Sequence, residues 1–436
     1  MEQTVVTAKK TARAASTVTG AAQVVVRSDL EPLHDVRHQV RLIREALKSE
    51  KRRLGFFLGA GCPLGIYDKD GKASIKHIPD VAGLTSAVGA ALDGKTDKES
   101  WSKLITDCTT DEVPIPNVEH ILTQLRTICA LKGKKEVSGM SADELCKLET
   151  KICGEIAKIV GKSLPEYTNA YHRFAAWISQ INRHSPIEIF TPNYDLLLEE
   201  ALERYEVPFF DGFVGAREPF FDIAAMEQDT MPARWMRLWK LHGSINWIKR
   251  TNDSVFRCHP APPGQQLLIY PSHLKYEQSR RMPYLAMIDR LRAFFRETDP
   301  EKTNPVLIVC GYSFADDHLN EVLLDGLRGN RSAHCFALMY PGLKDCEIAK
   351  VHASKHSNLS VLAWDGAVIG NRCGSYKPID RSTIAEGVGF DAAPAEKVEE
   401  SSGAGLCRLG DFHHFALFLE TQYGVTTGDE KDTEAR

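Results

Sequence analysis

The chain has 436 residues, enough for one large α/β domain with insertions or for two ordinary domains. Hydrophobic residues make up 43% and charged residues 26%, as in an ordinary globular protein. The formal net charge of −4 argues against general binding of nucleic acid by the whole chain, so we expect no direct nucleic-acid partner. The sequence has no run of eighteen apolar residues, so we expect no transmembrane helix and no membrane partner.

The eleven cysteines are odd in number and scattered, mostly within apolar stretches such as Val309-Cys310 and His334-Cys335-Phe336. No Cys-x-x-Cys pair occurs, so the sequence predicts neither a zinc ribbon nor a disulfide framework, and we expect no metal. Scattered, unpaired cysteines are typical of a reducing cytosol, which predicts a cytoplasmic location.

Residues 1–33 are predicted to be an N-terminal arm. Lys9, Lys10 and Arg13 occur there among many Ala and Thr residues, a composition found in organellar transit peptides and in flexible or helical arms. A helix over residues 34–50 is predicted next, from apolar residues at helical spacing (Val36, Val40, Ile43 and Leu47). This apolar stripe would pack on the protein's own core or supply a subunit contact.

The remaining elements alternate between strand and helix. Short apolar runs predict buried strands at residues 54–58, 187–190, 235–241, 267–270, 306–310, 334–339 and 359–364. Helical spacing or composition predicts helices from residue 117, over 132–165, 196–205 and 283–297, from near 316, and over 412–423. The alternation predicts an α/β fold with a Rossmann-like, doubly wound parallel sheet.

We predict a single α/β domain over residues 34–380, with a small helical insertion at about 132–165. Residues 380–406 are rich in Gly, Ala, Ser and Glu, as in a linker. Residues 381–436 are therefore predicted to be a linker followed by a C-terminal helix.

Four polar motifs each follow directly on a predicted strand: Gly59-Ala60-Gly61, Thr191 to Asp195, His242-Gly243-Ser244 and Gly311-Tyr312-Ser313. Each motif is weak evidence alone, because glycines also serve tight turns and Asn, Asp or His also caps helices. Parallel strands would bring all four motifs to one edge of the sheet, where ligands of open α/β sheets bind. The sequence therefore predicts a ligand site at that edge.

In this order the four motifs resemble the sirtuin family, over roughly residues 50–365. That family has a Gly-Ala-Gly turn after a strand, a Thr-x-Asn-x-Asp loop, a catalytic His followed by Gly, and a late Gly-x-Ser loop. The forms found here, Thr191-Pro192-Asn193-Tyr194-Asp195, Lys240-Leu241-His242-Gly243-Ser244 and Gly311-Tyr312-Ser313-Phe314, look more like the bacterial branch used in antiphage defence. Residues 269–276 with Pro283-Tyr284 are similar to members paired with a HerA-type ATPase.

The chain departs from deacylating sirtuins in two ways. Those proteins carry Gly-Ile-Pro-Asp-Phe-Arg soon after Gly-Ala-Gly, whereas here Ile78-Pro79-Asp80 comes later, Val81 replaces the Phe, and no Arg follows. The four cysteines of their structural zinc module are missing from this sequence. Both departures put an acyl-lysine channel in doubt and favour water as the acceptor.

The resemblance implies that NAD is the substrate and is cleaved at the nicotinamide–ribose bond, through an oxocarbenium-like state. We assign Asn193 to orienting a ribose hydroxyl and water, and His242 to general base catalysis as a neutral imidazole. Asp195 would contact the carboxamide or cap the helix after it, and Asp316 and His318 are expected to cap the next helix. Contacts to NAD are predicted for Gly59, Ala60, Gly61, Asp80, Thr191, Asp195, Ser244, Gly311, Tyr312 and Ser313.

The prediction is thus an NAD glycohydrolase (NADase) that gives nicotinamide and ADP-ribose. By resemblance it acts in the bacterial cytoplasm as a homo-oligomeric abortive-infection effector with a HerA-type ATPase partner. One alternative is an NAD-dependent protein deacylase or ADP-ribosyltransferase, and a second is a non-catalytic sensor of NAD or ADP-ribose. The residues leave open whether the product is linear or cyclic.

Overall fold

The fold is seen in a computed structural model, which describes residues 33–110, 113–130, 141–228, 230–250, 254–259, 261, 266–268, 283–296, 303–380 and 402–423. The predicted N-terminal arm, residues 269–276 and most of the predicted linker lie outside these ranges. None of the described helices is both long and apolar enough to cross a membrane.

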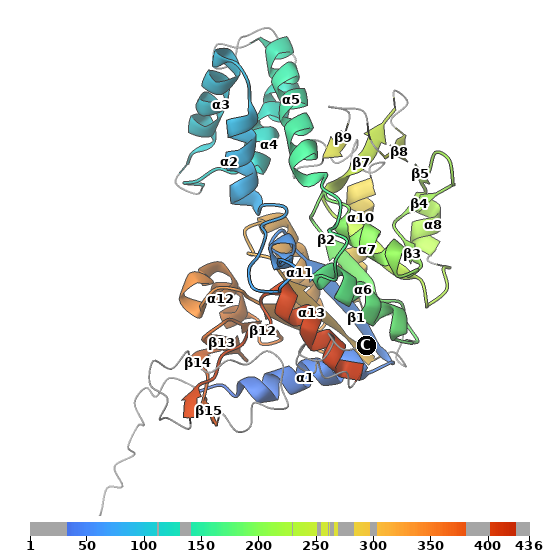
Figure 1. Cartoon of the computed structure of the whole chain (residues 1–436), viewed down its shortest axis with the longest axis vertical. Helices are drawn as coiled ribbons and strands as arrows, with labels where there is room; N and C mark the ends of the chain where they lie inside the picture. Colours follow the sequence, from blue (N-terminus) through green and yellow to red (C-terminus); the bar gives the residue numbers. More distant parts are fainter. Residues whose placement is uncertain are drawn as a thin grey trace, which may run out of the picture. The chain divides into compact units, whose positions relative to one another are not determined.

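A nine-stranded sheet is the framework of the fold (Figure 1). The strand order is β14-β13-β12-β11-β10-β1-β2-β6-β3. The seven strands from β12 to β3 are parallel, and β13 and β14 extend one edge as antiparallel strands, so the predicted α/β class is confirmed. The bounds are β1 Arg52–Leu58, β2 Glu188–Thr191, β3 Phe209–Phe210, β6 Met236–Lys240, β10 Thr303–Cys310, β11 His334–Leu338, β12 Leu359–Leu362, β13 Gly366–Ile369 and β14 Arg372–Ser375.

Successive residues of the central strands enter two different cores. Phe56 and Ile308 belong to one core, whereas Phe57 and Leu307 belong to the other. Strand side chains alternate between faces, so a strand that is apolar at every position must be covered on both sides. Helices α1 (Val36–Lys48), α6 (Ala170–Gln180) and α13 (Phe412–Glu420) cover the first face, and α10 (Pro283–Phe295), α11 (Asp317–Gly329) and α12 (Glu347–Lys355) cover the second.

Helix α1 begins where the sequence predicts it. Asp35 caps the helix by accepting a hydrogen bond from His38 N at 3.2 Å. The apolar stripe from Val36 to Leu47 is buried in the first core. The stripe packs on the protein's own sheet, which is the first of the two uses predicted for it. It is therefore not free for a subunit contact.

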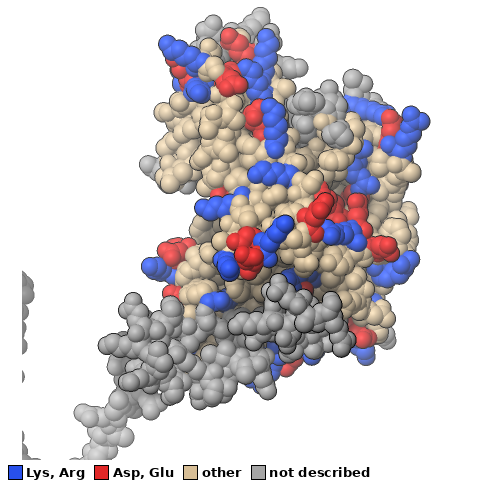
Figure 2. All heavy atoms as spheres, viewed as in Figure 1, with Lys and Arg blue, Asp and Glu red and all other residues tan. Residues whose placement is uncertain are grey.

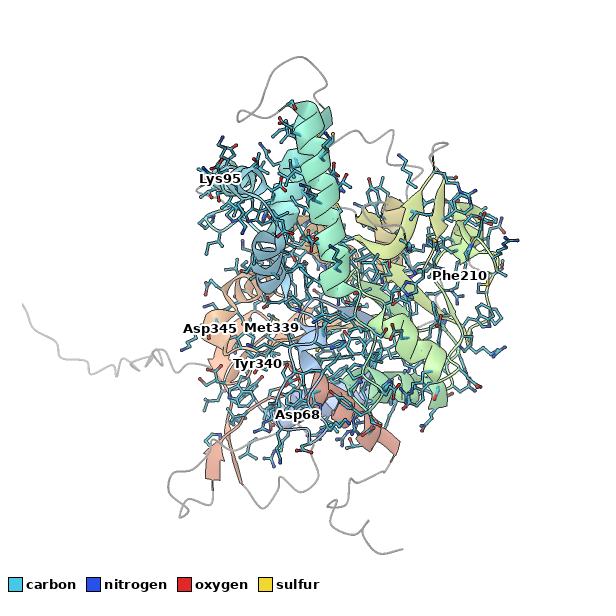
Figure 3. The ribbon with its side chains drawn as sticks, turned by 45° about the horizontal axis from the view of Figure 1, so that its top comes forward. Asp68, Lys95, Phe210, Met339, Tyr340 and Asp345 are labelled. Carbon is cyan, nitrogen blue, oxygen red and sulfur yellow. The ribbon has the colours of Figure 1, made fainter. Side chains whose placement is uncertain are left out.

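A helical insertion stands between β1 and β2, next to α6. It comprises α2 (Val81–Ala91), α3 (Lys95–Cys108), α4 (Val118–Ala130) and α5 (Ala142–Val160). The predicted insertion at about 132–165 includes α5, its residues 132–140 lie outside the described residues, and three further helices precede α5. Figure 3 brings the insertion forward, with Lys95 marking the start of α3 and Phe210 marking the edge strand β3.

A second, antiparallel sheet is formed by strands that lie before and after β6 in the chain. Its strand order is β4-β5-β8-β7-β9, with bounds β4 Phe213–Val214, β5 Phe220–Phe221, β7 Gly243–Lys249, β8 Val255–Arg257 and β9 Gln266–Leu268. The remaining described elements are η1 (Cys62–Gly65), α7 (Leu197–Arg204), α8 (Ile223–Gln228), η2 (Leu343–Asp345), the hairpin of β15 (Pro378–Asp380) with β16 (Ser402–Ala404), and η4 (Thr421–Tyr423).

On the face drawn in Figure 2, acidic and basic side chains are mixed among the described residues. No broad patch of one sign gathers on that part of the surface.

Candidate active site

The four motifs lie together at the carboxyl edge of the parallel sheet, because β10, β1, β2 and β6 are adjacent strands. Hydrogen bonds connect the loops that follow these strands. Gly61 N donates to Gly311 O at 2.8 Å, and Thr191 Oγ1 donates to Leu58 O at 2.7 Å. Leu241 N donates to Thr191 O at 2.8 Å. The convergence predicted from the strand pattern is therefore present as one connected loop cluster.

Glycines at this edge allow two backbones to touch. A Cβ atom on Gly59 would lie 2.4 Å from Gly311 O, and one on Gly61 would lie 2.9 Å from Gly311 Cα. Gly311 itself has a φ of +66°, where a side chain is strained. These glycines are needed for the contact between the β1 and β10 loops, whatever ligand binds there.

The backbone N–H and the side-chain amide nitrogen of Asn193 hold this residue in the loop cluster. Its N–H donates to Thr191 Oγ1 at 3.1 Å, and its Nδ2 donates to Gly59 O at 3.1 Å. Its Oδ1 is buried and has no hydrogen-bond partner among the described residues. A buried acceptor without a partner is costly, so this oxygen is suited to a donor from a ligand or from water.

Asp195 lines a small pocket that it shares with Asn193. Its Oδ1 accepts a hydrogen bond from Leu197 N at 3.1 Å, which is the helix-start role foreseen as an alternative. Lys240 donates to the carbonyl oxygen of Asp195 and, at 2.8 Å, to Glu199 Oε1. Burial raises the pKa of Asp195 to about 6, although the Lys240 charge opposes the rise. The pocket is lined by Leu58, Tyr171, Thr191, Asn193, Asp195, Leu198, Glu199 and Lys240.

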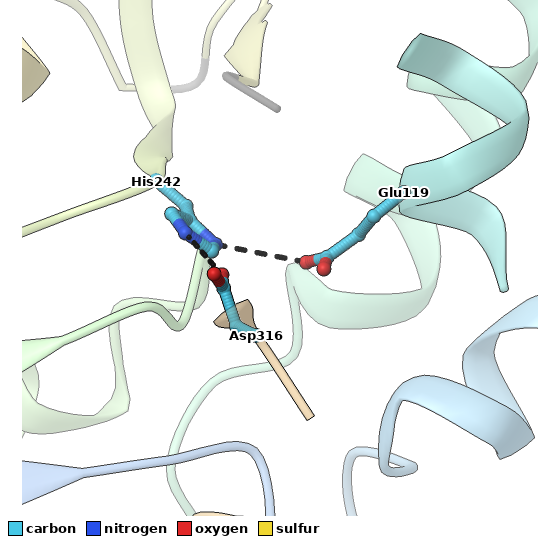
Figure 4. A group of neighbouring side chains, drawn as sticks. All are labelled: Glu119, His242 and Asp316. Carbon is cyan, nitrogen blue, oxygen red and sulfur yellow. Dashed lines mark ion pairs between the residues drawn. The ribbon is translucent and has the colours of Figure 1, made fainter. Parts of the chain in front are cut away.

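His242 lies in the turn between β6 and β7, between two carboxylates (Figure 4). Its Nε2 lies 3.0 Å from Asp316 Oδ2, and its Nδ1 lies 3.7 Å from Glu119 Oε1. The His242 side chain is only 6% exposed, against 12% for Asp316 and 20% for Glu119. Among the residues that the structure describes, these three are also the one group of His, Cys, Asp and Glu close enough to hold a metal ion.

The two carboxylates determine the charge of His242. Burial alone would lower the pKa of its imidazole, but hydrogen bonding and charge from Asp316 and Glu119 outweigh burial and raise the pKa to about 10. The same contact lowers the pKa of Asp316, against the effect of its own burial. These contacts favour the imidazolium form of His242 at pH 7. The general-base role expected for a neutral His242 stays a prediction, and the sequence did not reveal the carboxylates that favour the protonated ring.

The sequence did not identify Glu119 as a site residue, and it identified Asp316 only as a helix cap. Asp316 caps α11 as predicted, with Oδ1 accepting from Leu319 N at 3.1 Å, while its Oδ2 faces His242. Glu119 is in the first turn of α4, within the insertion. No local signal distinguishes it from any acidic residue at a helix start. Lys240 had a local signal, as a charged residue ending an apolar strand.

The other predicted site residues have structural partners or are exposed. Asp80 is exposed and caps α2 through Gly83 N at 2.8 Å. Ser244 is fully buried, with Oγ 3.4 Å from Tyr194 O. Ala60 is half-buried beside the glycines, and Ser313 is exposed at the same edge.

The Tyr312 loop holds a strained backbone. The Tyr312 hydroxyl donates to Asn320 Oδ1 at 2.8 Å, so its side chain is engaged within the protein. Phe314 has a φ of +59°, a conformation that costs a non-glycine residue about 1–3 kcal/mol. Its ring is fully buried 4.9 Å from the Tyr312 ring, and this burial offsets the strain.

A family model described as a SIR2-like domain matches residues 187–360. The match supports a sirtuin-like family and an NAD-using enzyme. No curated protein matches the chain. The matched range contains Asn193, His242 and Asp316.

Two parts of the site lie outside the SIR2-like match. The Gly59-Ala60-Gly61 turn and Glu119 both precede residue 187. They nevertheless contact matched residues, since Gly59 O accepts from Asn193 and Glu119 faces His242. Strand β1 also lies between β2 and β10 in the sheet. The site is thus completed by segments that the family model does not cover.

We expect Gly59→Ala to destabilise the protein, because the new Cβ would press against the Gly311 backbone. Overpacking of this kind costs about 1–3 kcal/mol of unfolding free energy. The matched control is Gly329→Ala at the end of α11, where an added Cβ meets nothing within 4 Å. Thermal and denaturant unfolding of both variants checks this. A Gly59→Ala protein as stable as the control would contradict the close backbone contact.

Proposed function

We propose that this protein is an NAD glycohydrolase that cleaves NAD to nicotinamide and ADP-ribose. The observation that carries the proposal is the Asn193 carboxamide, whose Nδ2 is fixed on Gly59 O while its buried Oδ1 has no partner in the described part of the chain. An acceptor held in this way can orient a ribose hydroxyl or the attacking water without reorganising. The SIR2-like match supplies the expectation that NAD is the ligand.

The charges beside Asn193 also support cleavage of a glycosidic bond. Tyr194, the next residue, donates its hydroxyl to Glu119 Oε1 at 2.9 Å, so the His242 cluster adjoins the Asn193 loop. One imidazolium and two carboxylates give that cluster a net charge of −1. Departure of nicotinamide leaves positive charge on the ribose, and fixed negative charge stabilises such a state.

In this mechanism the C1′–N bond breaks and its electron pair goes to nicotinamide. Water adds to C1′, and its proton is released to a carboxylate or to solvent. Asn193 orients the ribose and the water. His242, as an imidazolium, donates hydrogen bonds and takes no proton, which replaces the general-base role expected from the sequence.

Two alternatives are weaker. A deacylase or ADP-ribosyltransferase would need a site for an acyl-lysine or protein acceptor, and the described residues contain no four-cysteine group of the kind found in the zinc module of deacylating sirtuins. A non-catalytic sensor would gain nothing from a buried imidazolium with two carboxylates, because burying charges is costly.

The proposal includes a biological setting that is taken from the sequence resemblance. We place the protein in the bacterial cytoplasm as a homo-oligomeric antiphage effector of abortive infection, with a HerA-type ATPase as partner. An NADase that is always active would deplete its own cell. Restraint by self-assembly or by a second protein would solve that problem.

Assays of purified protein with NAD distinguish the three functions. We expect equal amounts of nicotinamide and ADP-ribose to be released, at the same rate with and without an acyl-lysine peptide, because water is the acceptor. Chromatography of the products measures this. Release only in the presence of the peptide would favour a deacylase, and binding of NAD without release would favour a sensor.

Asn193→Ala and His242→Ala should each lower NAD turnover by a factor of about 100 or more, the loss typical of a positioned orienting or charge-stabilising group. The control is His184→Ala, since His184 is two-thirds exposed and lies near only Glu50 in an ion pair. Turnover is compared in variants with the thermal stability of the wild type. Normal hydrolysis by a folded Asn193→Ala protein would overturn the assignment.

The isolated protein is expected to be a homo-oligomer with low or conditional activity that rises when the ATPase partner is added. Symmetric assemblies repeat one interface on every subunit, which allows a single contact to restrain all the active sites. Light scattering at micromolar concentration, together with the NAD assay, checks both points. A fully active, monodisperse monomer would contradict this part of the proposal.

A further inference from the structure

We propose that Glu119, carried by α4 of the helical insertion, is a positioning residue that holds the His242 ring between two carboxylates. The proposal rests on the NAD hydrolysis proposed above, but the contact it concerns can be measured without turnover. It assigns a function to the insertion, namely completing the site from outside the SIR2-like region.

The geometry of the three side chains carries the inference. Asp316 and Glu119 face opposite nitrogens of the His242 ring, at 3.0 Å from Nε2 and 3.7 Å from Nδ1. An imidazole has two N–H donors only when it is protonated. The two ion pairs therefore favour one orientation of the ring and its protonated form. Either carboxylate alone would pair with only one of the two ring nitrogens.

One hydrogen bond holds the Glu119 carboxylate, and two others hold the backbone at the start of its helix. Its Oε1 accepts the Tyr194 hydroxyl at 2.9 Å, which links α4 to the Asn193 loop. The first turn of α4 is capped by Asn117 Oδ1, which accepts from Glu119 N at 2.9 Å. Val118 N donates to Thr85 Oγ1 on α2 at 2.9 Å. A carboxylate anchored in this way can position a neighbouring ring.

The same arrangement argues against a metal ion shared by all three residues. The three ligand atoms are close enough to surround an ion. However, the two carboxylates contact different nitrogens of the same ring, and these nitrogens point in different directions. An ion bound to one nitrogen would leave the other carboxylate facing an N–H. A carboxylate on the far N–H is also the usual partner of a metal-bound histidine, so the geometry argues only against an ion held by all three residues.

The first test is the pH dependence of nicotinamide release by Glu119→Gln. The groups facing His242 are Glu119 on α4, Asp316 at the start of α11, and Tyr194 in the loop after β2. The imidazolium exists below the His242 pKa, so activity should fall as pH rises through that pKa. Loss of one carboxylate lowers the pKa, and the fall should move to lower pH by about one unit or more. We expect kcat to drop about tenfold or more with little change in KM, and Glu119→Asp to restore part of it.

The matched control is Glu149→Gln, which removes an equivalent carboxylate from the same insertion. Glu149 on α5 pairs with Arg126 at 2.6 Å and has a similar exposure of 24%. We expect this variant to keep the wild-type pH profile. Equal effects of Glu119→Gln and Glu149→Gln, accompanied by equal losses of thermal stability, would reduce Glu119 to a structural residue and overturn the proposal.

The second test does not depend on NAD chemistry. NMR titration of ¹³C-labelled histidine side chains, with the His242 signal assigned by its loss in His242→Asn, should show a lower His242 pKa in Glu119→Gln than in the wild type. An unchanged pKa would overturn the proposal, even if NAD is hydrolysed. A lowered pKa in a protein that does not release nicotinamide would refute the NADase function alone. Stoichiometric Zn²⁺ or Mn²⁺ binding that is lost in Glu119→Gln would show a metal ligand instead.

Discussion

The contact between the backbones of the β1 and β10 loops is the constraint on which the site depends. Gly59 N donates to Cys310 O at 2.9 Å and Gly61 N donates to Gly311 O, with no room for a side chain between the two loops. This contact directs Gly59 O toward Asn193 Nδ2. It also fixes the path of the chain from Gly311 to Asp316, which places a carboxylate beside His242. The glycines thus act through geometry, by setting where the polar groups of two other loops lie.

Burial gives the charged groups at this edge their properties. His242 and Asp195 are both almost fully enclosed, yet their pKa values are raised for different reasons. Desolvation raises that of Asp195, whereas the carboxylates overcome desolvation at His242. In water the same pairs would be weak, because a high dielectric screens them. The enclosing helices are therefore part of the electrostatics of the site.

The sequence predicted the parts of the molecule that depend on local patterns. Continuous apolar runs such as residues 54–58 and 306–310 identified the central strands, since a strand buried on both faces has no polar positions. The order of the strands brought the four motifs to one edge. Extra strands such as β13 and β14 were missed, because they follow a tight turn and have short, mixed sequences.

The composition of the His242 cluster could not be read from the sequence. Glu119 and His242 are brought together only by tertiary packing of the insertion, and one acidic residue in a first helical turn looks like any other. Asp316 showed a capping signal that was correct but incomplete, because the second oxygen of a capping carboxylate is free to face another element. Long-range electrostatics therefore favour a protonated His242, a charge state that the residue type alone did not indicate.

The position of β1 in the sheet has a consequence for how the protein is made. This strand pairs with β10, and the thiol of Cys62, which follows the strand, donates a hydrogen bond to the backbone oxygen of Cys310, 248 residues later in the chain. Contacts of such high sequence separation form slowly, and a chain emerging from the ribosome cannot form them until the distant partner has been synthesised. The Asn193 loop, the glycine turn and the Asp316 carboxylate therefore come together only after most of the polypeptide exists. Unfinished chains therefore lack a complete site.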